Sequence, residues 1–121
     1  MSTGGKSREA LRDELLKLSG SALERQFVHW LHDGGYRLPD LAQHLITDPY
    51  TRPDFYQHEG RTCIYVDGPH HEQPDRQMID DFTRRLLERR GYQVVVVTYP
   101  DRWVDEIGAW TDVFGTGGTR R

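Results

Sequence analysis

Residues 52–71, RPDFYQHEGRTCIYVDGPHH, decide the fold expected for the whole chain. This stretch predicts two strands joined by a tight turn at residues 58–61, in which Gly60 can adopt a positive φ. Side chains alternate between the two faces of a strand, so we expect two sets along the second strand. One face carries Cys63, Tyr65 and Asp67, and the other carries Thr62, Ile64 and Val66. Antiparallel pairing of the two strands brings Asp54 beside Asp67.

Acidic and imidazole side chains gather at one end of this predicted hairpin. Asp54 opens the first strand, Asp67 ends the second, and His70 and His71 follow the break at Gly68-Pro69. Buried carboxylates are usually paired or bound to a cation, and oxygen ligands suit Mg²⁺. A histidine can act as general base or acid, because its pKa lies close to the working pH. The pattern therefore favours a Mg²⁺-dependent site for phosphodiester hydrolysis by water.

Each of these residues also has a purely structural interpretation. Asp54 is a common residue type at strand ends, Asp67-Gly68 is a simple turn signal, and either histidine alone is typical of a surface loop. A zinc site from Cys63, His58 and one of the two later histidines lacks a familiar ligand spacing. The functional interpretation rests on the joint occurrence of these residues.

The order of the motifs resembles the PD-(D/E)XK nuclease superfamily, and within it the endonucleases of the very-short-patch-repair (Vsr) type. The resemblance covers roughly residues 22–99. The matching pieces are Glu24 on a helix, Pro53-Asp54-Phe55, IYVDG at residues 64–68, His70-His71, and GYQVVVV at residues 91–97.

This resemblance implies a three-layer α/β fold of the restriction-endonuclease-like kind, with a small mixed β-sheet flanked by helices. It implies a metal-dependent endonuclease that hydrolyses DNA, of a nicking, repair, restriction or defence type. Asp54 and Asp67 would be ligands of Mg²⁺ (or Mn²⁺), helped by the Val66 carbonyl, and Glu24 would hold a water in the outer shell. His71, which the spacing from Gly68 favours, or His70 would be the base or acid. Such domains often sit beside helicase-like or other protein partners.

The sequence departs from the superfamily at two positions. The E-x-K motif falls on Tyr65 and Asp67, so a tyrosine replaces the glutamate and an aspartate replaces the lysine. Vsr-type enzymes also lack that glutamate and use a backbone carbonyl and a histidine instead, but their structural zinc ligands are not evident in a chain with one cysteine. These departures motivate an alternative, a catalytically inactive nuclease-like module that binds DNA or a protein.

Helices are expected on both sides of the hairpin in the sequence. Residues 7–18 and 21–32 have helical spacing of apolar side chains, and Ser21-x-x-Glu24 also fits a capping box, which is the structural alternative for Glu24. Within residues 36–50, the stretch from Leu38 to Ile46 could form a short helix or an irregular strand. Residues 74–90 form the clearest helix, with Met78, Ile79, Phe82 and Leu86 facing inward and Leu87 flanking them.

The segments after the hairpin complete the fold and suggest a surface for substrate. The run Val94–Val97 predicts a strand buried on both faces, joined to the hairpin by a β-α-β crossover. Trp103, Ile107, Trp110 and Phe114 form a helical stripe that suits core packing or an interface with another chain. Arg84 and Arg85 form either a solvated face or, with Arg52, a surface that grips phosphates.

Length and composition predict one domain. We expect a disordered tail at residues 1–7, a single Vsr-like domain at 8–114 and a flexible tail at 115–121. A net charge of −3 counts mildly against strong non-specific DNA binding, and the single cysteine rules out an internal disulfide. No apolar run reaches the ~18 residues of a membrane span and no signal peptide is visible, so we expect a cytoplasmic protein without membrane contact. A homo-oligomer remains open.

Overall fold

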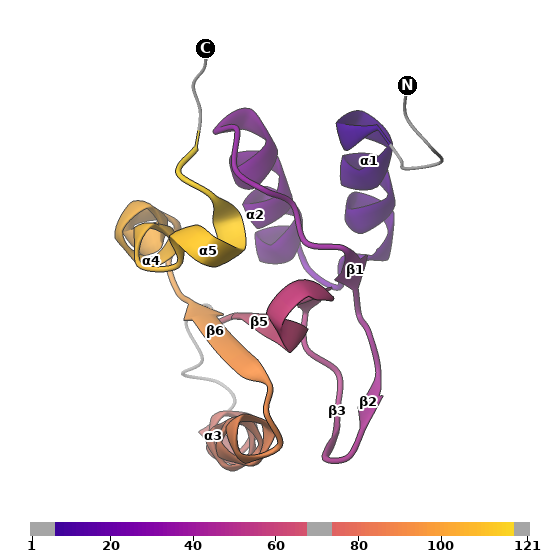
Figure 1. Cartoon of the computed structure of the whole chain (residues 1–121), viewed down its shortest axis with the longest axis vertical. Coiled ribbons are helices and arrows are strands. Elements are labelled where there is room, and N and C mark those ends of the chain that lie inside the picture. Colours follow the sequence, from indigo (N-terminus) through magenta and orange to yellow (C-terminus); the bar gives the residue numbers. More distant parts are fainter. Residues whose placement is uncertain (1–6, 68–73, 118–121) are drawn as a thin grey trace.

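A mixed sheet lies between two helical layers in the computed structural model, which describes residues 7–67 and 74–117, with side chains in the helix at 74–89 described from residue 81 onward. Figure 1 shows helices α1 (Arg8–Leu18), α2 (Ala22–Asp33), α4 (Trp103–Gly108) and α5 (Thr111–Phe114) on one side of the sheet, and α3 (Pro74–Arg89) on the other. The expected α/β class with a small mixed, helix-flanked sheet is confirmed. None of the helices in the described ranges has the length and apolar character needed to cross a membrane.

The predicted hairpin forms the centre of the sheet. The strands are β1 (Leu41–Ala42), β4 (Phe55–Gln57), β5 (Thr62–Val66) and β6 (Gln93–Val97), and they lie in that order. Strands β4 and β5 pair antiparallel, with Phe55 opposite Ile64. A 3₁₀ turn, η1 (Glu59–Arg61), joins them, and Gly60 has the positive φ of 72° that the turn requires. The hairpin prediction is therefore confirmed.

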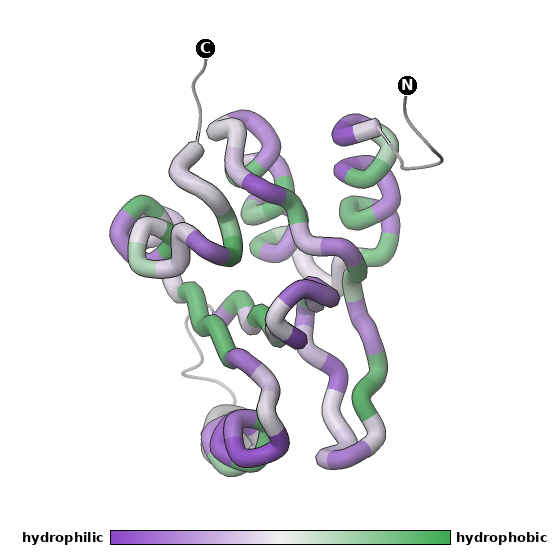
Figure 2. Tube along the Cα trace, in the orientation of Figure 1, coloured by the Kyte–Doolittle hydropathy of each residue, from purple (hydrophilic) through white to green (hydrophobic). Residues whose placement is uncertain are grey.

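Helix α3 connects β5 to β6, which run parallel, so the predicted crossover is also confirmed. The two faces of the sheet belong to separate apolar clusters, as the alternation in β5 predicts. Ile64, Val66, Val95 and Val97 pack under α1, α2, α4 and α5, whereas Cys63, Tyr65, Val94 and Val96 belong to the cluster that contains Leu87 of α3. The green tube of β6 in Figure 2 marks this apolar strand between the layers.

The orientation predicted for α3 is wrong over the part whose side chains are described. Phe82 is 59% exposed, Leu86 is half-buried, and Leu87, expected only at the flank, is fully buried. The helix instead turns Arg84 and Leu87 toward the sheet, because Arg84 pairs there with Asp67. The predictions for Met78 and Ile79 fall outside the described side chains.

Two other segments needed the structure to resolve them. Of the two alternatives for residues 38–46, the structure has short strands and no helix: β1 lies in this range, and β2 (Ile46–Thr47) pairs with β3 (Tyr50–Thr51) in a separate small hairpin. The C-terminal aromatic stripe is divided between α4 and α5, after a 3₁₀ turn, η2 (Pro100–Arg102). The break falls at Trp110, whose φ of −124° and ψ of 53° are not helical. Trp103, Ile107 and Phe114 are nevertheless buried, which confirms core packing.

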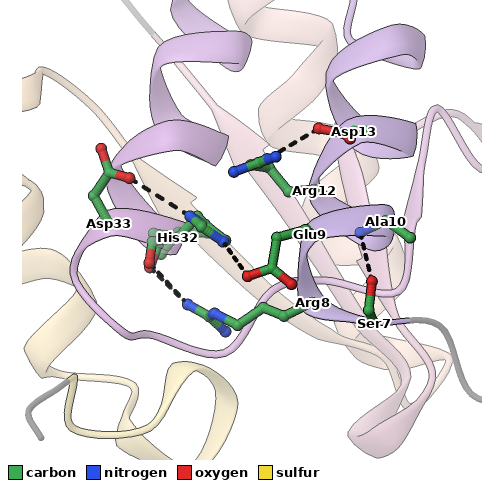
Figure 3. A network of polar contacts seen from close by, with 9 residues as sticks. Ser7, Arg8, Glu9, Ala10, Arg12, Asp13, His32 and Asp33 are labelled. Carbon is green, nitrogen blue, oxygen red and sulfur yellow. Dashed lines mark hydrogen bonds and ion pairs between the residues drawn. The ribbon is translucent and has the colours of Figure 1, made fainter.

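A polar network fixes α1 against the end of α2 (Figure 3). The Arg8 guanidinium donates to the carbonyls of Leu31 and His32, at 3.2 and 3.1 Å, in the last turn of α2, where backbone acceptors lack helical partners. His32 lies 3.7 Å from the Glu9 carboxylate. Ser7, expected in the tail, is the N-cap of α1. The network holds the helix that carries Glu24.

Candidate functional site

Two aspartates flank the end of β5, the central strand. Asp54 lies immediately before β4, and its Oδ2 accepts a hydrogen bond of 2.8 Å from the Val66 N–H. Asp67 lies immediately after β5, and its N–H donates to the Val97 carbonyl over 2.8 Å. The antiparallel and parallel pairings of β5 thus bring both carboxyl groups to one end of the sheet, as the sequence predicts for Asp54 and Asp67.

Glu24 reaches this end of the sheet from the first turn of α2, and only 8% of its surface is exposed. Its backbone N–H donates to Ser21 Oγ over 3.1 Å, which is half of the predicted capping box. The other half differs, because Glu24 Oε1 accepts from the Gly20 N–H at 2.8 Å. Glu24 therefore caps its helix and also faces Asp54, so the structural and functional interpretations of this residue are compatible.

The carboxyl of Asp54 is held in an environment that disfavours its charge. Burial is the largest cause, followed by the negative charge of Glu24, and together they raise the pKa of Asp54 from 3.8 to about 7. The hydrogen bond from Val66 acts in the opposite direction. A hydrogen bond between the Asp54 and Glu24 side chains and the charge of Asp67 add to the increase. The environment of Asp54 thus favours the neutral form of its carboxyl group.

Asp67 has a different partner. The Arg84 Nη2 donates to both carboxylate oxygens of Asp67, at 2.9 Å each. The same guanidinium lies over the ring of Tyr65, with Cζ 4.5 Å from the ring centroid. Tyr65 is buried, and its hydroxyl lies 3.2 Å from Thr51 Oγ1. The prediction of Arg84 as part of a solvated face is therefore wrong, because its side chain points into the acidic end of the sheet.

Gln43 belongs to this site, although its sequence context contains no signal for it. Its side-chain Nε2 donates to Glu24 Oε1 over 3.2 Å, and its backbone N–H donates to the Asp54 carbonyl over 3.0 Å. Its φ of 57° lies in the left-handed region, which is unfavourable for a residue with a side chain. Gln43 thus bridges the two acidic residues from an irregular segment that pattern analysis does not resolve.

The structure describes some of the remaining predicted site residues but not all of them. Arg52 and Arg85 are both exposed, and Arg52 lies just before Pro53 on the segment that leads to Asp54. Val66 contributes its N–H, while a role for its carbonyl stays a prediction. His70 and His71 lie outside the described residues, so the base or acid expected there stays a prediction.

The chemistry of this site suits a hard cation, because a second charge on adjacent carboxyl groups needs compensation. Among residues whose side chains are described, no group of three or more His, Cys, Asp or Glu is arranged to hold a metal ion. Asp54 and Glu24 are only two residues, fewer than such a group requires, and the carboxylate of Asp67 is already bound to Arg84. Comparison of the chain with protein-family models, curated proteins and solved structures found no match.

Proposed function

We propose that this chain is a Mg²⁺- or Mn²⁺-dependent endonuclease that hydrolyses DNA phosphodiester bonds. The observation that carries the proposal is the gathering of Asp54, Asp67 and the nearly buried Glu24 at one end of the sheet, where burial and the charge of Glu24 raise the pKa of Asp54 to about 7. Perturbed carboxyl groups next to one another are frequent at catalytic and metal sites.

The resemblance to PD-(D/E)XK enzymes suggests a role for each residue, and the positions of Asp54, Asp67 and Glu24 at one end of the sheet support it. Asp54 and Asp67 would hold the cation, with the Val66 carbonyl beside them, and the bound cation would polarise the phosphate and activate the attacking water. Glu24 would hold a water in the outer shell of the cation. Arg52 and Arg85, both exposed, would contact the phosphate backbone of the DNA. His71 or His70 would transfer the proton.

The finer fold assignment belongs to the same proposal. The order of an acidic residue, an antiparallel hairpin, a crossover helix and a parallel strand is the order that the resemblance to PD-(D/E)XK enzymes of the Vsr type implies. The four-stranded mixed sheet with helices on both faces supports a restriction-endonuclease-like fold.

A second candidate function is an inactive nuclease-like module that binds DNA or a protein. It is favoured by Tyr65, which stands where the superfamily has a glutamate, and by the ion pair that engages Asp67. In this second function, the guanidinium of Arg84 takes the place of a metal ion permanently. The ion pair of Arg84 and Asp67 then only stabilises the fold.

Cleavage of supercoiled plasmid distinguishes the two. The purified chain would be incubated with plasmid in Mg²⁺, Mn²⁺ or EDTA, next to Asp54→Asn and the control Asp101→Asn, which neutralises an exposed aspartate in η2. We expect metal-dependent nicking by the wild type and the control, and none by Asp54→Asn. Equal nicking by Asp54→Asn contradicts the proposed site. DNA binding without cleavage, on matched and mismatched substrates alike, supports the inactive module.

A further inference from the structure

Arg84 is bound to Asp67, one of the acidic residues at the end of the sheet. Its side chain is 12% exposed and that of Asp67 is 17% exposed, so the ion pair is largely shielded from water. Asp81, one turn earlier on α3, is 3.9 Å from Arg84 Nη1. Removing one partner of a shielded pair leaves the other charge uncompensated, which is costly away from water. Arg84 is therefore part of the electrostatics of the site.

The guanidinium contacts both positions at which the sequence departs from the E-x-K motif. It is bonded to Asp67, which stands at the lysine position, and it lies on the ring of Tyr65, which stands at the glutamate position. The positive charge absent from β5 is thus present at the same end of the sheet, but it comes from α3. The planar guanidinium suits this place, because it can stack on a ring while it donates to an oxyanion.

We propose that Arg84 is the resident cation of the site: it neutralises Asp67 in the metal-free protein, is displaced by a divalent cation, and then contacts the DNA phosphate. The inference rests on the proposed function, since it needs both a metal and a phosphodiester substrate.

Competition for Asp67 is the reason for the displacement. Both carboxylate oxygens of Asp67 accept from the same Arg84 nitrogen, so a cation that takes one of them weakens the ion pair. Tyr65 then keeps the released guanidinium close to the site, because its ring is fixed at the hydroxyl end by Thr51. A phosphate held near the cation is the natural new partner for the guanidinium.

Calorimetric titration of Mn²⁺ into the full chain tests the first part. Arg84→Gln removes the competing charge, and Arg89→Gln removes an exposed positive charge from the last turn of the same helix as a matched control. We expect Mn²⁺ to bind Arg84→Gln about tenfold more tightly than the wild type, and Arg89→Gln to be unchanged. An affinity of Arg84→Gln equal to that of the control, or weaker, overturns the inference.

DNA binding tests the second part. With Ca²⁺ present, we expect Arg84→Gln to bind duplex DNA more weakly than the wild type and with a salt dependence lower by about one counterion. In EDTA the difference should be smaller, because Arg84 is then engaged by Asp67 and the variant loses only the charge of the pair, not a contact to DNA. A loss of DNA affinity that is the same with and without Ca²⁺ contradicts the exchange.

Should Arg84→Gln fail to fold, the wild type supplies its own measurement. Titration with Mg²⁺ should shift the Arg84 side-chain Nε–H resonance and accelerate its hydrogen exchange, whereas an unchanged resonance at saturating Mg²⁺ overturns the inference. The outcomes also separate the two proposals. Metal binding that depends on Asp54 but not on Arg84 removes only the resident-cation role, while absence of metal binding in every variant removes both.

Discussion

Asp54, just before β4, and Glu24, in the first turn of α2, lie close enough that the negative charge of Glu24 raises the pKa of the Asp54 carboxyl. The pair joins the hairpin to the helical layer at the end of the sheet where Asp67 also lies. Two acids in such a contact lower the stability of the fold when both are charged, and this gives several measurable consequences.

The first prediction concerns pH and stability. The pKa of Asp54 is raised to about 7 in the folded state from 3.8, so folding favours its protonated form. Stability should fall as the pH rises from about 4 to 7 and stay at the lower level above that range. The loss is at most about 4 kcal/mol, and smaller because water reaches part of the carboxyl. Chemical denaturation in EDTA should show a flatter profile for Asp54→Asn, whereas an equally steep profile would show that another group titrates.

The second prediction concerns divalent cations and stability. At pH 8, where Asp54 is ionised, Mg²⁺ or Mn²⁺ at ten times its Kd should stabilise the fold by about 1.4 kcal/mol, which corresponds to roughly 5 °C in Tm. Scanning calorimetry should detect this shift in the wild type and in Asp101→Asn, but not in Asp54→Asn. At pH 5 the shift should be smaller, because protons then compete for the site.

The third prediction concerns Gln43. Gln43→Ala keeps the left-handed backbone and removes the hydrogen bond to Glu24, so it should lower the free energy of unfolding by about 1–2 kcal/mol. Gln43→Gly removes the same bond but relieves the strain of φ 57°, so it should be the more stable of the two variants by about 1 kcal/mol. Urea denaturation gives the order. An alanine variant as stable as the glycine variant would contradict the strain.

The fourth prediction concerns the orientation of α3. Leu87→Ala empties a fully buried position and should cost about 2–5 kcal/mol, while Phe82→Ala at an exposed position should stay within about 0.5 kcal/mol of the wild type. Urea denaturation of both variants provides the comparison. A large loss in Phe82→Ala with little in Leu87→Ala would restore the orientation that the apolar pattern predicts.

Short-range patterns predict the centre of the fold well. The turn around Gly60, the alternation in β5 and the valine run of β6 each specify local geometry, and the crossover follows from their order. The orientation of α3 could not be predicted in this way, because hydrophobic periodicity treats Arg84 as a surface residue. A long arginine can turn inward when a carboxylate and an aromatic ring receive it, and both partners come from β5.

In the candidate site, too, some residues could be predicted from local sequence patterns and others could not. Asp54, Asp67 and Glu24 were recognisable because each belongs to a recurrent motif. The contribution of Gln43 depends on its own left-handed backbone conformation after β1. A glycine in the sequence suggests such a conformation, but a glutamine does not. The break at Trp110 could not be predicted either, because the helical spacing of the aromatic residues continues past Trp110 although the helix itself is interrupted there.

The carboxylate of Glu106 in α4 has a consequence for solubility. It accepts hydrogen bonds from both the N–H and the hydroxyl of Thr98, at 2.8 and 2.6 Å, just beyond the valine-rich β6, which is the outermost strand at that side of the described sheet. A β-branched outer strand is a template on which another chain can stack, and a charged group at its end discourages this. We therefore expect the replacement of Glu106 by alanine to increase light scattering on heating, because the charge beside the end of β6 is lost.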